Sequence, residues 1–448
     1  MFGTSGIRGQ VGEEVTADLA LSVGRAVGVD ADRVVVGRDA RESGRLLVDA
    51  LTAGLRESGT DVVDLGFAAT PTVARSVAWE DADAGAVVTA SHNPPEDNGI
   101  KLWQPSGQAY DSPLQDLITE RVREETTDLQ PWDGLGERER RHAEEGRPSE
   151  ARRRHLDALV DAVELSGSLS VVVDLGNGAG GIAVDALAEL GCAVETLNAQ
   201  PDGSFPGRPS EPTPENCETL AATVAATDAD LGIAHDGDAD RMRAVAGDGT
   251  YLSGDVTLAL LARAAASEGD SVAAPVDTSL AVDDHLAAGG IDLVRTKVGD
   301  VYVAERASEP GVAFGGEPSG AWIWPAETLC PDGPLAACKI VALASERPLA
   351  DRLADIETYP IRRGSVETAH KGRVMDRVRE RVTDAYDDVT TLDGVRVSLG
   401  DAWFLLRASG TQPIVRITAE ARDEERTEAV LAEARAHLDA AIAAVEAD

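Results

Sequence analysis

Short apolar runs alternate with amphipathic stretches up to about residue 350, and this alternation limits the possible folds more than any other feature. Strands are expected at Arg33–Gly37, Val62–Leu65, Gly85–Thr89, Val171–Leu175, Leu231–His235, Ser271–Val276, Asp292–Thr296 and Gly311–Phe314. Helical periodicity lies between them, for example over Leu46–Glu57, Gly181–Leu190, Pro214–Ala226 and Leu280–Ala288. Strands that alternate with helices are typical of α/β domains. The pattern therefore predicts three successive α/β domains.

The order of elements changes near residue 350. A helix is expected over Arg373–Tyr386, then strands at Val395–Leu399, Trp403–Arg407 and Ile414–Ala419, then a long helix over Glu424–Val445. Consecutive strands between two helices indicate a smaller α+β domain. Domain limits are expected in the charge-rich stretch before 148, at a Gly-Asp-Gly-Thr turn near 248, and near 348. The predicted domains are residues 1–147, 148–248, 249–348 and 349–448.

The sequence is strongly acidic, since 79 Asp and Glu residues oppose 41 Lys and Arg residues and give a formal net charge of −38. Nucleic-acid binding needs a basic surface, so this balance argues against a nucleic-acid partner. Salt reduces such self-repulsion, because the Debye length falls to about 3 Å at 1 M salt. We therefore expect a protein from a halophile. The few lysines that remain are better candidates for specific roles; they are Lys101, Lys297, Lys339 and Lys371.

The longest apolar runs are too short to span a bilayer, and the N-terminal residues lack the features of a secretory signal. The cysteines are scattered and form no Cys-x-x-Cys pair; they are Cys192, Cys217, Cys330 and Cys338. Such cysteines are typical of reduced thiols rather than of a disulfide framework or a zinc site. We expect a cytoplasmic protein with no membrane partner.

A metal site is predicted in the segment Asp236-Gly237-Asp238-Ala239-Asp240-Arg241, which follows an expected strand. Alternating carboxylates in a tight turn can face one centre, and oxygen ligands suit a hard cation such as Mg²⁺ or Ca²⁺. An EF-hand is poorly supported, because Arg241 and Gly247 stand where that loop needs glycine and a bidentate glutamate. The pattern of a two-carboxylate phosphatase loop is not met either. For the triplet alone, an acidic surface turn is the alternative.

The segment Gly176–Gly181 matches the G-x-G-x-x-G pattern of dinucleotide-binding folds, and Glu195 follows at a suitable distance. However, Asp174 lies just before the first glycine and would face the pyrophosphate. A tight strand-to-helix turn is therefore favoured over a nicotinamide or flavin site.

Two glycine-rich loops, Gly3–Gly9 and Arg407–Pro413, carry hydroxyl groups and an arginine. Successive N–H groups of such loops can bind an anion, and Ser, Thr and Arg add donors for a phosphate. A third loop, Gly315–Gly320, places Glu317 and Ser319 where they could hold neighbouring hydroxyls of a polyol. Each loop alone is equally compatible with an ordinary turn.

Ser91 lies in the segment Thr-Ala-Ser-His-Asn-Pro rather than in a G-x-S-x-G elbow, and the adjacent His92 is poorly placed to act as its base. A hydrolase triad is therefore disfavoured. A serine that accepts a phosphoryl group needs a cation, positive charge and a general acid or base. The candidates are, in that order, the three aspartates of the predicted metal site, Arg8 with Arg241, and Lys101.

Taken together and in this order, these segments resemble the α-D-phosphohexomutase superfamily over essentially the whole chain. Thr89–Pro94 is similar to its phosphoserine loop, and Asp236–Arg241 to its metal loop. Gly316–Gly320 is similar to its sugar-recognition loop, and Arg407–Thr411 to its phosphate-binding loop. The resemblance implies three α/β domains with mixed sheets and a smaller α+β C-terminal domain, arranged around a central cleft.

The resemblance also implies a mechanism. Ser91 would carry a phosphoryl group and bind Mg²⁺ together with Asp236, Asp238 and Asp240. The phosphoserine would transfer its group to the free hydroxyl of a hexose monophosphate. The resulting 1,6-bisphosphate would turn over in the cleft and return its other phosphate to Ser91, so a sugar 1,6-bisphosphate is the expected activator.

By the same resemblance, Arg8, His92, Asn93 and Lys101 would serve proton transfer and phosphate contact. The implied substrate-binding residues are Arg241, Lys297, Glu317, Ser319, Arg407, Ser409, Gly410, Thr411 and Arg416. The expected partner is a small sugar phosphate, bound by a monomer or a homodimer.

Some positions depart from patterns common in the superfamily and bear on the choice of sugar. Ala321 stands where many bacterial members have histidine, Gln412 where glutamate is common, and Ala239 where many have glycine. The Ser-Gly-Thr at 409–411 and the opening Phe2–Gly9 resemble phosphoglucosamine mutases more than mannose and glucose enzymes. Phosphoglucosamine mutase is the predicted activity. The alternatives are a phosphomannomutase/phosphoglucomutase, a pentose phosphate mutase, a non-catalytic sugar-phosphate binding protein and a dehydrogenase.

Overall fold

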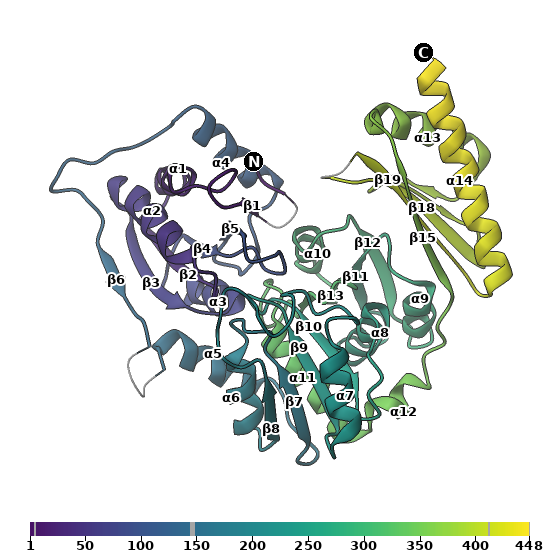
Figure 1. Ribbon diagram of the computed structural model, residues 1–448, viewed down its shortest axis with the longest axis horizontal. Helices are drawn as coiled ribbons and strands as arrows, with labels where there is room; N and C mark the ends of the chain where they lie inside the picture. The colour runs from purple at the N-terminus through teal and green to yellow at the C-terminus, as the bar shows by residue number, and fades with distance from the viewer. Residues whose placement is uncertain (4–5, 144–147, 411–412, 448) are drawn as a thin grey trace.

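The computed structural model describes residues 1–3, 6–143, 148–410 and 413–447, which form four sheets with helices packed against them. Figure 1 shows the sheets in chain order, from the purple N-terminal sheet to the sheet beside the yellow C-terminal helix. We number domains I to IV by these sheets. Within the described ranges, no helix is both long and apolar enough to cross a membrane.

Domain I has a mixed sheet of order β1-β5-β4-β2-β3-β6. Its strands are β1 (Ile7–Gln10), β2 (Arg33–Arg38), β3 (Asp61–Phe67), β4 (Ala84–Val88), β5 (Asp97–Trp103) and β6 (Arg138–Arg140). Its helices are α1 (Ala17–Gly28), α2 (Gly44–Glu57), α3 (Thr70–Trp79) and α4 (Ser112–Arg123). The central strands β2 and β4 are apolar on both faces, because elements of the domain cover both sides of the sheet.

Strand β5 is a feature that the apolar alternation does not predict, because Asn98-Gly99 is a turn signal and a lysine interrupts the apolar residues. β5 runs antiparallel to β4 and places Lys101 opposite Val87. The segment with Ser91 is therefore the connection of a hairpin. This pairing brings Lys101 back beside the loop that it follows by ten residues.

Domain II has a mixed sheet of order β10-β9-β7-β8. Its strands are β7 (Ser170–Asp174), β8 (Ala193–Leu197), β9 (Leu231–His235) and β10 (Met242–Ala246). Its helices are α5 (Glu150–Asp161), α6 (Gly181–Glu189) and α7 (Glu218–Ala226). β9 and β10 form a hairpin, so the acidic segment 236–241 is its turn.

Domain III has a mixed sheet of order β12-β11-β13-β14. Its strands are β11 (Ser271–Pro275), β12 (Asp292–Thr296), β13 (Val312–Gly316) and β14 (Trp322–Ile323). Its helices are α8 (Gly254–Ala265), α9 (Leu280–Ala287), α10 (Asp300–Ala307), α11 (Gly333–Glu346) and α12 (Leu349–Leu353). One apolar core runs through domains II and III, and Leu349, Ile356 and Tyr359 also pack into it. The residue limits expected between the domains stay predictions.

Domain IV has an antiparallel sheet of order β15-β19-β18-β17-β16. Its strands are β15 (Ile361–Glu367), β16 (Val389–Thr390), β17 (Val395–Ser398), β18 (Ala402–Ala408) and β19 (Ile414–Ala421). The helices α13 (Lys371–Ala385) and α14 (Glu424–Ala447) pack against one face, and Trp403 and Leu405 contact Val276 of domain III on the other. The predicted fold class, three α/β domains with mixed sheets and one α+β domain, is confirmed.

Candidate active site

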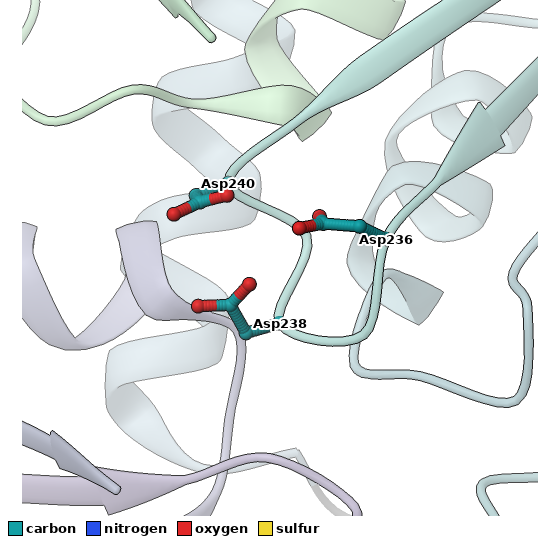
Figure 2. Close-up of side chains that lie close together, drawn as sticks. All are labelled: Asp236, Asp238 and Asp240. Carbon is teal, nitrogen blue, oxygen red and sulfur yellow. The ribbon is translucent and has the colours of Figure 1, made fainter. Parts of the chain in front are cut away.

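The turn between β9 and β10 gathers three buried carboxylates. One oxygen from each of Asp236, Asp238 and Asp240 lies within 4.8 Å of the others, and Figure 2 shows the side chains turned toward a common centre. Ala239 has a φ of 58°, a left-handed conformation that bends the turn sharply. The carboxylates that the sequence places in one loop therefore do face one point.

This cluster fits a divalent cation. Oδ1 of Asp238 and Oδ1 of Asp240 are buried and have no hydrogen-bond partner among the described residues, although buried polar atoms are nearly always satisfied. Burial, and then repulsion from Asp240 and Asp238, raises the pKa of Asp236 well above its ordinary value. A cation held by carboxylates would satisfy both oxygens and oppose that repulsion. Oxygen-only ligands of this kind suit Mg²⁺ or Ca²⁺.

The Ser91 hydroxyl lies against this cluster. It donates a hydrogen bond of 2.6 Å to Oδ2 of Asp236, and the residue is fully buried. Ser91 has a φ of 52°, a strained conformation that is often found at functional loops. Arg41 holds the loop in place, since its guanidinium donates to the carbonyl oxygens of Ser91 and Asn93 at 3.0 and 2.6 Å. Ser210 of domain II also donates to the Ser91 carbonyl, at 2.8 Å.

Lys101 reaches the same cluster from β5. Its Nζ donates to Oδ2 of Asp238 at 2.8 Å and is also paired with Oδ2 of Asp240. Burial disfavours the charged ammonium, but Asp238 and Asp240 outweigh burial and raise the pKa of Lys101. Burial likewise works against the charged form of Asp238, but Lys101, Thr70 and Arg8 together outweigh it and lower the pKa of that carboxyl. Lys101 is therefore a buried, permanently charged group near neutral pH.

His92 and Arg8 lie at the edge of the cluster. Nδ1 of His92 is 3.4 Å from Oγ of Ser91. Arg241, then burial and the Arg8 cation, lower the pKa of His92 far below its ordinary value, so its imidazole is neutral. Nε of Arg8 is buried without a partner in the described chain.

A cavity of about 950 Å³ opens beside Arg8 and His92, at the edge of this cluster, and is bounded by domains I, III and IV. Arg8 and His92 line it from domain I, Tyr302 from domain III and Gly410 from domain IV. In Figure 1, β1 and α10 lie beside this region. The site is therefore built where domains meet, which is a usual position for small-molecule sites.

The loop after β13 holds Glu317 and Ser319. Oε1 of Glu317 accepts from the Gly299 amide at 2.6 Å, and its Oε2 accepts from Oγ of Ser319 at 3.0 Å. Burial, followed by repulsion from Asp300, raises the pKa of Glu317 to about 7. The Met242 amide donates to the Gly320 carbonyl at 3.0 Å, which fastens this loop to the strand after the acidic turn.

Domain IV supplies a cluster of cations. Arg407 and Arg416 are direct partners on β18 and β19, so their side chains leave the same face of the sheet. Like charges in this position destabilise a sheet unless an anion compensates them. Lys371 donates to the carbonyl oxygens of Ser409 and Gly410 at 2.5 and 3.4 Å, so a third cation lies at this loop. Thr411 lies outside the described residues.

Lys297, the remaining predicted contact, lies in the exposed turn between β12 and α10. Its Nζ is 5.2 Å from the centre of the Tyr302 ring, which lines the cavity. Lys339, by contrast, donates to the Ala162 carbonyl at 2.7 Å, between domains II and III. Lys101, Lys297 and Lys371 thus lie at the carboxylate cluster or at the loops near the cavity. Lys339 instead connects two domains through its hydrogen bond to a backbone carbonyl.

Several residues that position the site were not identified in the sequence. Thr70, at the start of α3, donates to Oδ2 of Asp238 at 2.6 Å, and Arg41 and Ser210 fix the Ser91 loop. Sequence reasoning missed them because each acts across domains or over more than 40 residues of sequence. The one available signal was the buried Thr-Pro start of α3, which marks a helix N-terminus.

The glycine-rich segment after β7 packs against the acidic turn. Asp174 is buried and accepts from Nε of Arg208 at 2.7 Å and from the Gly176 amide at 2.9 Å. The Ala179 amide donates to the Gly237 carbonyl at 3.0 Å. A Cβ atom at Gly178 would lie 2.6 Å from that same carbonyl oxygen. These glycines therefore allow two turns to pack together, as the favoured interpretation expected.

Family models match almost the whole chain. They are described as phosphoglucomutase/phosphomannomutase alpha/beta/alpha domain I at residues 1–128, domain II at 153–249, domain III at 253–359, and the C-terminal domain at 361–437. The chain belongs to the phosphoglucomutase/phosphomannomutase family.

Relatives within the phosphoglucomutase/phosphomannomutase family are similar over their full length. A probable phosphoglucosamine mutase of Methanopyrus kandleri is 47% identical over 435 residues, which cover 95% of this chain and 94% of that protein. A protein of the same name from Methanosarcina acetivorans is 45% identical, with 95% and 96% covered. The crystal structure of a family protein from Burkholderia thailandensis has a TM-score of 0.87 at 29% identity and covers 98% of both chains.

Proposed function

We propose that this chain is a Mg²⁺-dependent phosphohexomutase that interconverts a hexose 6-phosphate and a hexose 1-phosphate, with glucosamine phosphate as its preferred substrate. One observation carries the proposal: the Ser91 hydroxyl lies 2.6 Å from Asp236 in a buried carboxylate cluster with unsatisfied oxygens. A serine in that position can carry a phosphoryl group beside a cation. The relatives named phosphoglucosamine mutase support the choice of sugar.

Asp236, Asp238 and Asp240 would hold the Mg²⁺ together with a phosphoryl oxygen on Ser91. A bound cation at this place neutralises charge on the transferring phosphoryl group. Arg8, with its buried Nε that has no partner among the described residues, adds a donor from domain I, and Arg241 adds a partly buried cation from the turn itself. Positioning and positive charge are the main contributions that phosphoryl transfer needs from a protein.

The reaction needs two proton transfers at the site. As the bond between phosphorus and the Ser91 oxygen breaks, a new bond forms to the sugar oxygen, whose proton must leave. We assign these two proton transfers to Lys101, whose ammonium is charged, and to His92, which is neutral and whose Nδ1 lies 3.4 Å from Oγ of Ser91. In the free site the raised pKa of Lys101 makes it a weak acid and the lowered pKa of His92 makes it a weak base, so a bound phosphoryl group and cation must bring both pKa values closer to neutral pH. In the second half of the cycle, the same groups exchange these roles by microscopic reversibility.

The rest of the cavity would hold the sugar phosphate. Arg407 and Arg416 face the same side of the domain IV sheet and would bind the phosphate that is not reacting, with Ser409, Gly410 and Thr411 in the adjoining loop. Glu317 and Ser319 would hold sugar hydroxyls, and Lys297 would contact the ligand from the domain III turn. A cavity of about 950 Å³ leaves room for a 1,6-bisphosphate to turn over.

Phosphorus NMR tests this function. The protein is kept in molar KCl with Mg²⁺ and a trace of sugar 1,6-bisphosphate, and glucosamine, glucose and mannose 6-phosphates are offered separately. A new anomeric phosphate signal that is strongest with glucosamine 6-phosphate supports the proposal. A stronger signal with mannose or glucose 6-phosphate favours the phosphomannomutase/phosphoglucomutase alternative. No signal with any sugar, from a protein that still binds them, indicates a non-catalytic sugar-phosphate binding protein.

The strong negative charge supports a further part of the proposal, namely that the protein works in the cytoplasm of a halophile. A net charge of −38 on 448 residues is compatible with a compact fold where salt screens repulsion. The melting temperature should therefore rise between about 0.1 and 2 M KCl. A melting temperature that falls as the KCl concentration rises would contradict the proposed halophilic origin.

A further inference from the structure

One carboxylate of domain IV links the Lys297 turn of domain III to Arg407. Oδ2 of Asp393, in the turn before β17, accepts from the Val298 amide at 3.0 Å. The same oxygen lies 3.4 Å from Nη1 of Arg407. A single side chain therefore contacts both the turn that carries Lys297 and one of the cations on the domain IV sheet.

The orientation of the Lys297 turn depends on carboxylates from two domains. Asp393 accepts the Val298 amide, and Glu317 accepts the next amide, that of Gly299, at 2.6 Å. Gly299 has a φ of 135° and precedes α10 without any side-chain cap. Since the two carboxylates are the acceptors for these amides, they fix the backbone of the turn from which the Lys297 side chain extends.

The Lys297 ammonium is available for a ligand. It has no hydrogen bond or ion pair with any residue that the structure describes, and it lies over the face of Tyr302. Cation–π contact leaves the N–H donors of an ammonium free to bind an anion. Tyr302 in turn lines the 950 Å³ cavity that Gly410 also lines.

The turn that carries Asp393 is itself fixed. Gly394 has a φ of 83°, and a Cβ atom there would lie 2.3 Å from the Leu406 carbonyl oxygen and 3.0 Å from Cα of Arg407. The turn therefore packs directly on the backbone of Arg407. Movement of Arg407 and movement of Asp393 are tied to each other by this contact.

We propose that Asp393 is a positioning residue that couples Arg407 in domain IV to Lys297 in domain III, so that both cations meet one sugar phosphate together. The proposal rests on the proposed function, in which Arg407 binds the substrate phosphate. Asp393 does not touch the substrate. It acts by holding the guanidinium of Arg407 and the backbone of the Lys297 turn in a fixed relation.

Two substitutions separate the parts of this role. Asp393→Asn keeps an oxygen that can accept the Val298 amide but removes the charge beside Arg407. Asp393→Ala removes both contacts and leaves the Val298 amide without its acceptor. Asp284→Asn is the matched control, because Asp284 accepts from the Tyr359 hydroxyl at 2.7 Å and from Arg422 of domain IV, away from the Lys297 turn.

The test is a double-mutant cycle read as the Kd for glucosamine 6-phosphate, measured by calorimetry on the full chain in a Ser91→Ala background without turnover. We expect Asp393→Ala to weaken binding about 10-fold and Asp393→Asn about 3-fold. In a Lys297→Met background, Asp393→Ala should weaken binding only about 3-fold, because the contact with Arg407 is still lost while the part of the effect that passes through Lys297 is already absent. Asp284→Asn should leave Kd unchanged.

The proposal would be overturned if the fold-changes in Kd of Asp393→Ala and Lys297→Met multiply in the double variant. It would also be overturned if Asp284→Asn weakens binding as much as Asp393→Asn does. Failure of the proposed function can be told apart from failure of this proposal. A wild-type protein that binds the sugar phosphate without converting it contradicts the proposed function, but the double-mutant cycle can still be measured as changes in Kd. If another sugar phosphate binds in place of glucosamine 6-phosphate, the cycle is run with that one. Wild type that binds none overturns both.

Discussion

Lys101 shows how much one buried charge contributes to the site. Its ammonium is paired with Asp238 and Asp240 and is buried with them, away from solvent. Charges in such surroundings interact more strongly than at the surface, and an unpaired buried charge is costly. Lys101 is therefore expected to be more than a surface lysine, as its rarity in the sequence and the resemblance to the superfamily both indicated.

Lys101→Met is predicted to lower kcat by about 100-fold or more, because it removes a proton donor and leaves two buried aspartates unpaired. The measurement is the initial rate of glucosamine 6-phosphate conversion at saturating substrate. Lys339→Met is the matched control, since Lys339 contacts only the Ala162 carbonyl between domains II and III among the described residues. Equal loss in both variants would show that the effect is structural.

The raised pKa of Glu317 predicts that the stability of the folded protein depends on pH. Its pKa is raised from 4.5 to about 7 by burial and by Asp300, so between these pH values the folded state holds a proton that the unfolded state has lost. Stability from this group is therefore present at low pH and is lost as pH rises toward 7. Relative to wild type, Glu317→Gln should melt several degrees higher at pH 8 than at pH 5. A constant difference across that range would contradict the prediction.

At the scale of elements, loops from different domains are held by a few buried side chains. Arg41 is the clearest case, because its guanidinium donates to the carbonyl oxygens of Ser91, Asn93 and Asp97 and pairs with the buried Asp39. Backbone carbonyls at a buried loop need such donors, since water does not reach them.

Arg41→Met should destabilise the protein by about 3 kcal/mol, because it leaves Asp39 and several carbonyls without a donor. The measurement is the midpoint of chemical unfolding with Mg²⁺ absent, so that metal binding does not contribute. Arg45→Met is the control, because Arg45 is exposed at the start of α2 and forms no side-chain hydrogen bond or ion pair with the described residues. Equal midpoints for the two variants would refute this role of Arg41.

Most elements could be predicted because their signal is local. β9 and β12 have the expected limits, and β2 and α6 differ from them by one residue. β5 could not be found in this way, because its residues form a strand only through pairing with β4 and β1 on both sides. The members of the predicted site were recognisable from loop motifs, whereas Asp393 carries no motif and is defined only by the contact between domains III and IV.

At the scale of the whole molecule, the site exists only when the domains are assembled. The carboxylate cluster comes from domain II, Ser91 and Lys101 come from domain I, and the cavity extends to domains III and IV. A bound cation would hold domains I and II together through Ser91 and the three aspartates. Metal binding should therefore stabilise the folded protein as well as support its reaction.

Removal of Mg²⁺ with a chelator is predicted to abolish turnover and to lower the melting temperature. Saturating Mg²⁺, at 100 times its Kd, should add about 2.7 kcal/mol to stability. The shift should vanish in Asp240→Asn and persist in Asp248→Asn, which alters an exposed carboxylate in the turn after β10. A shift of the same size in all three proteins would mean that the cation binds elsewhere.

The most direct test of the central claim follows a phosphoryl group from the sugar to Ser91. The protein is mixed with glucosamine 1,6-bisphosphate labelled with ³²P on both phosphates and is then digested and mapped by mass spectrometry and counting. The account predicts one labelled peptide that contains phosphorylated Ser91, with no label on the Ser91→Ala chain. A mutase reaction with no labelled Ser91, or with label retained in Ser91→Ala, would contradict it.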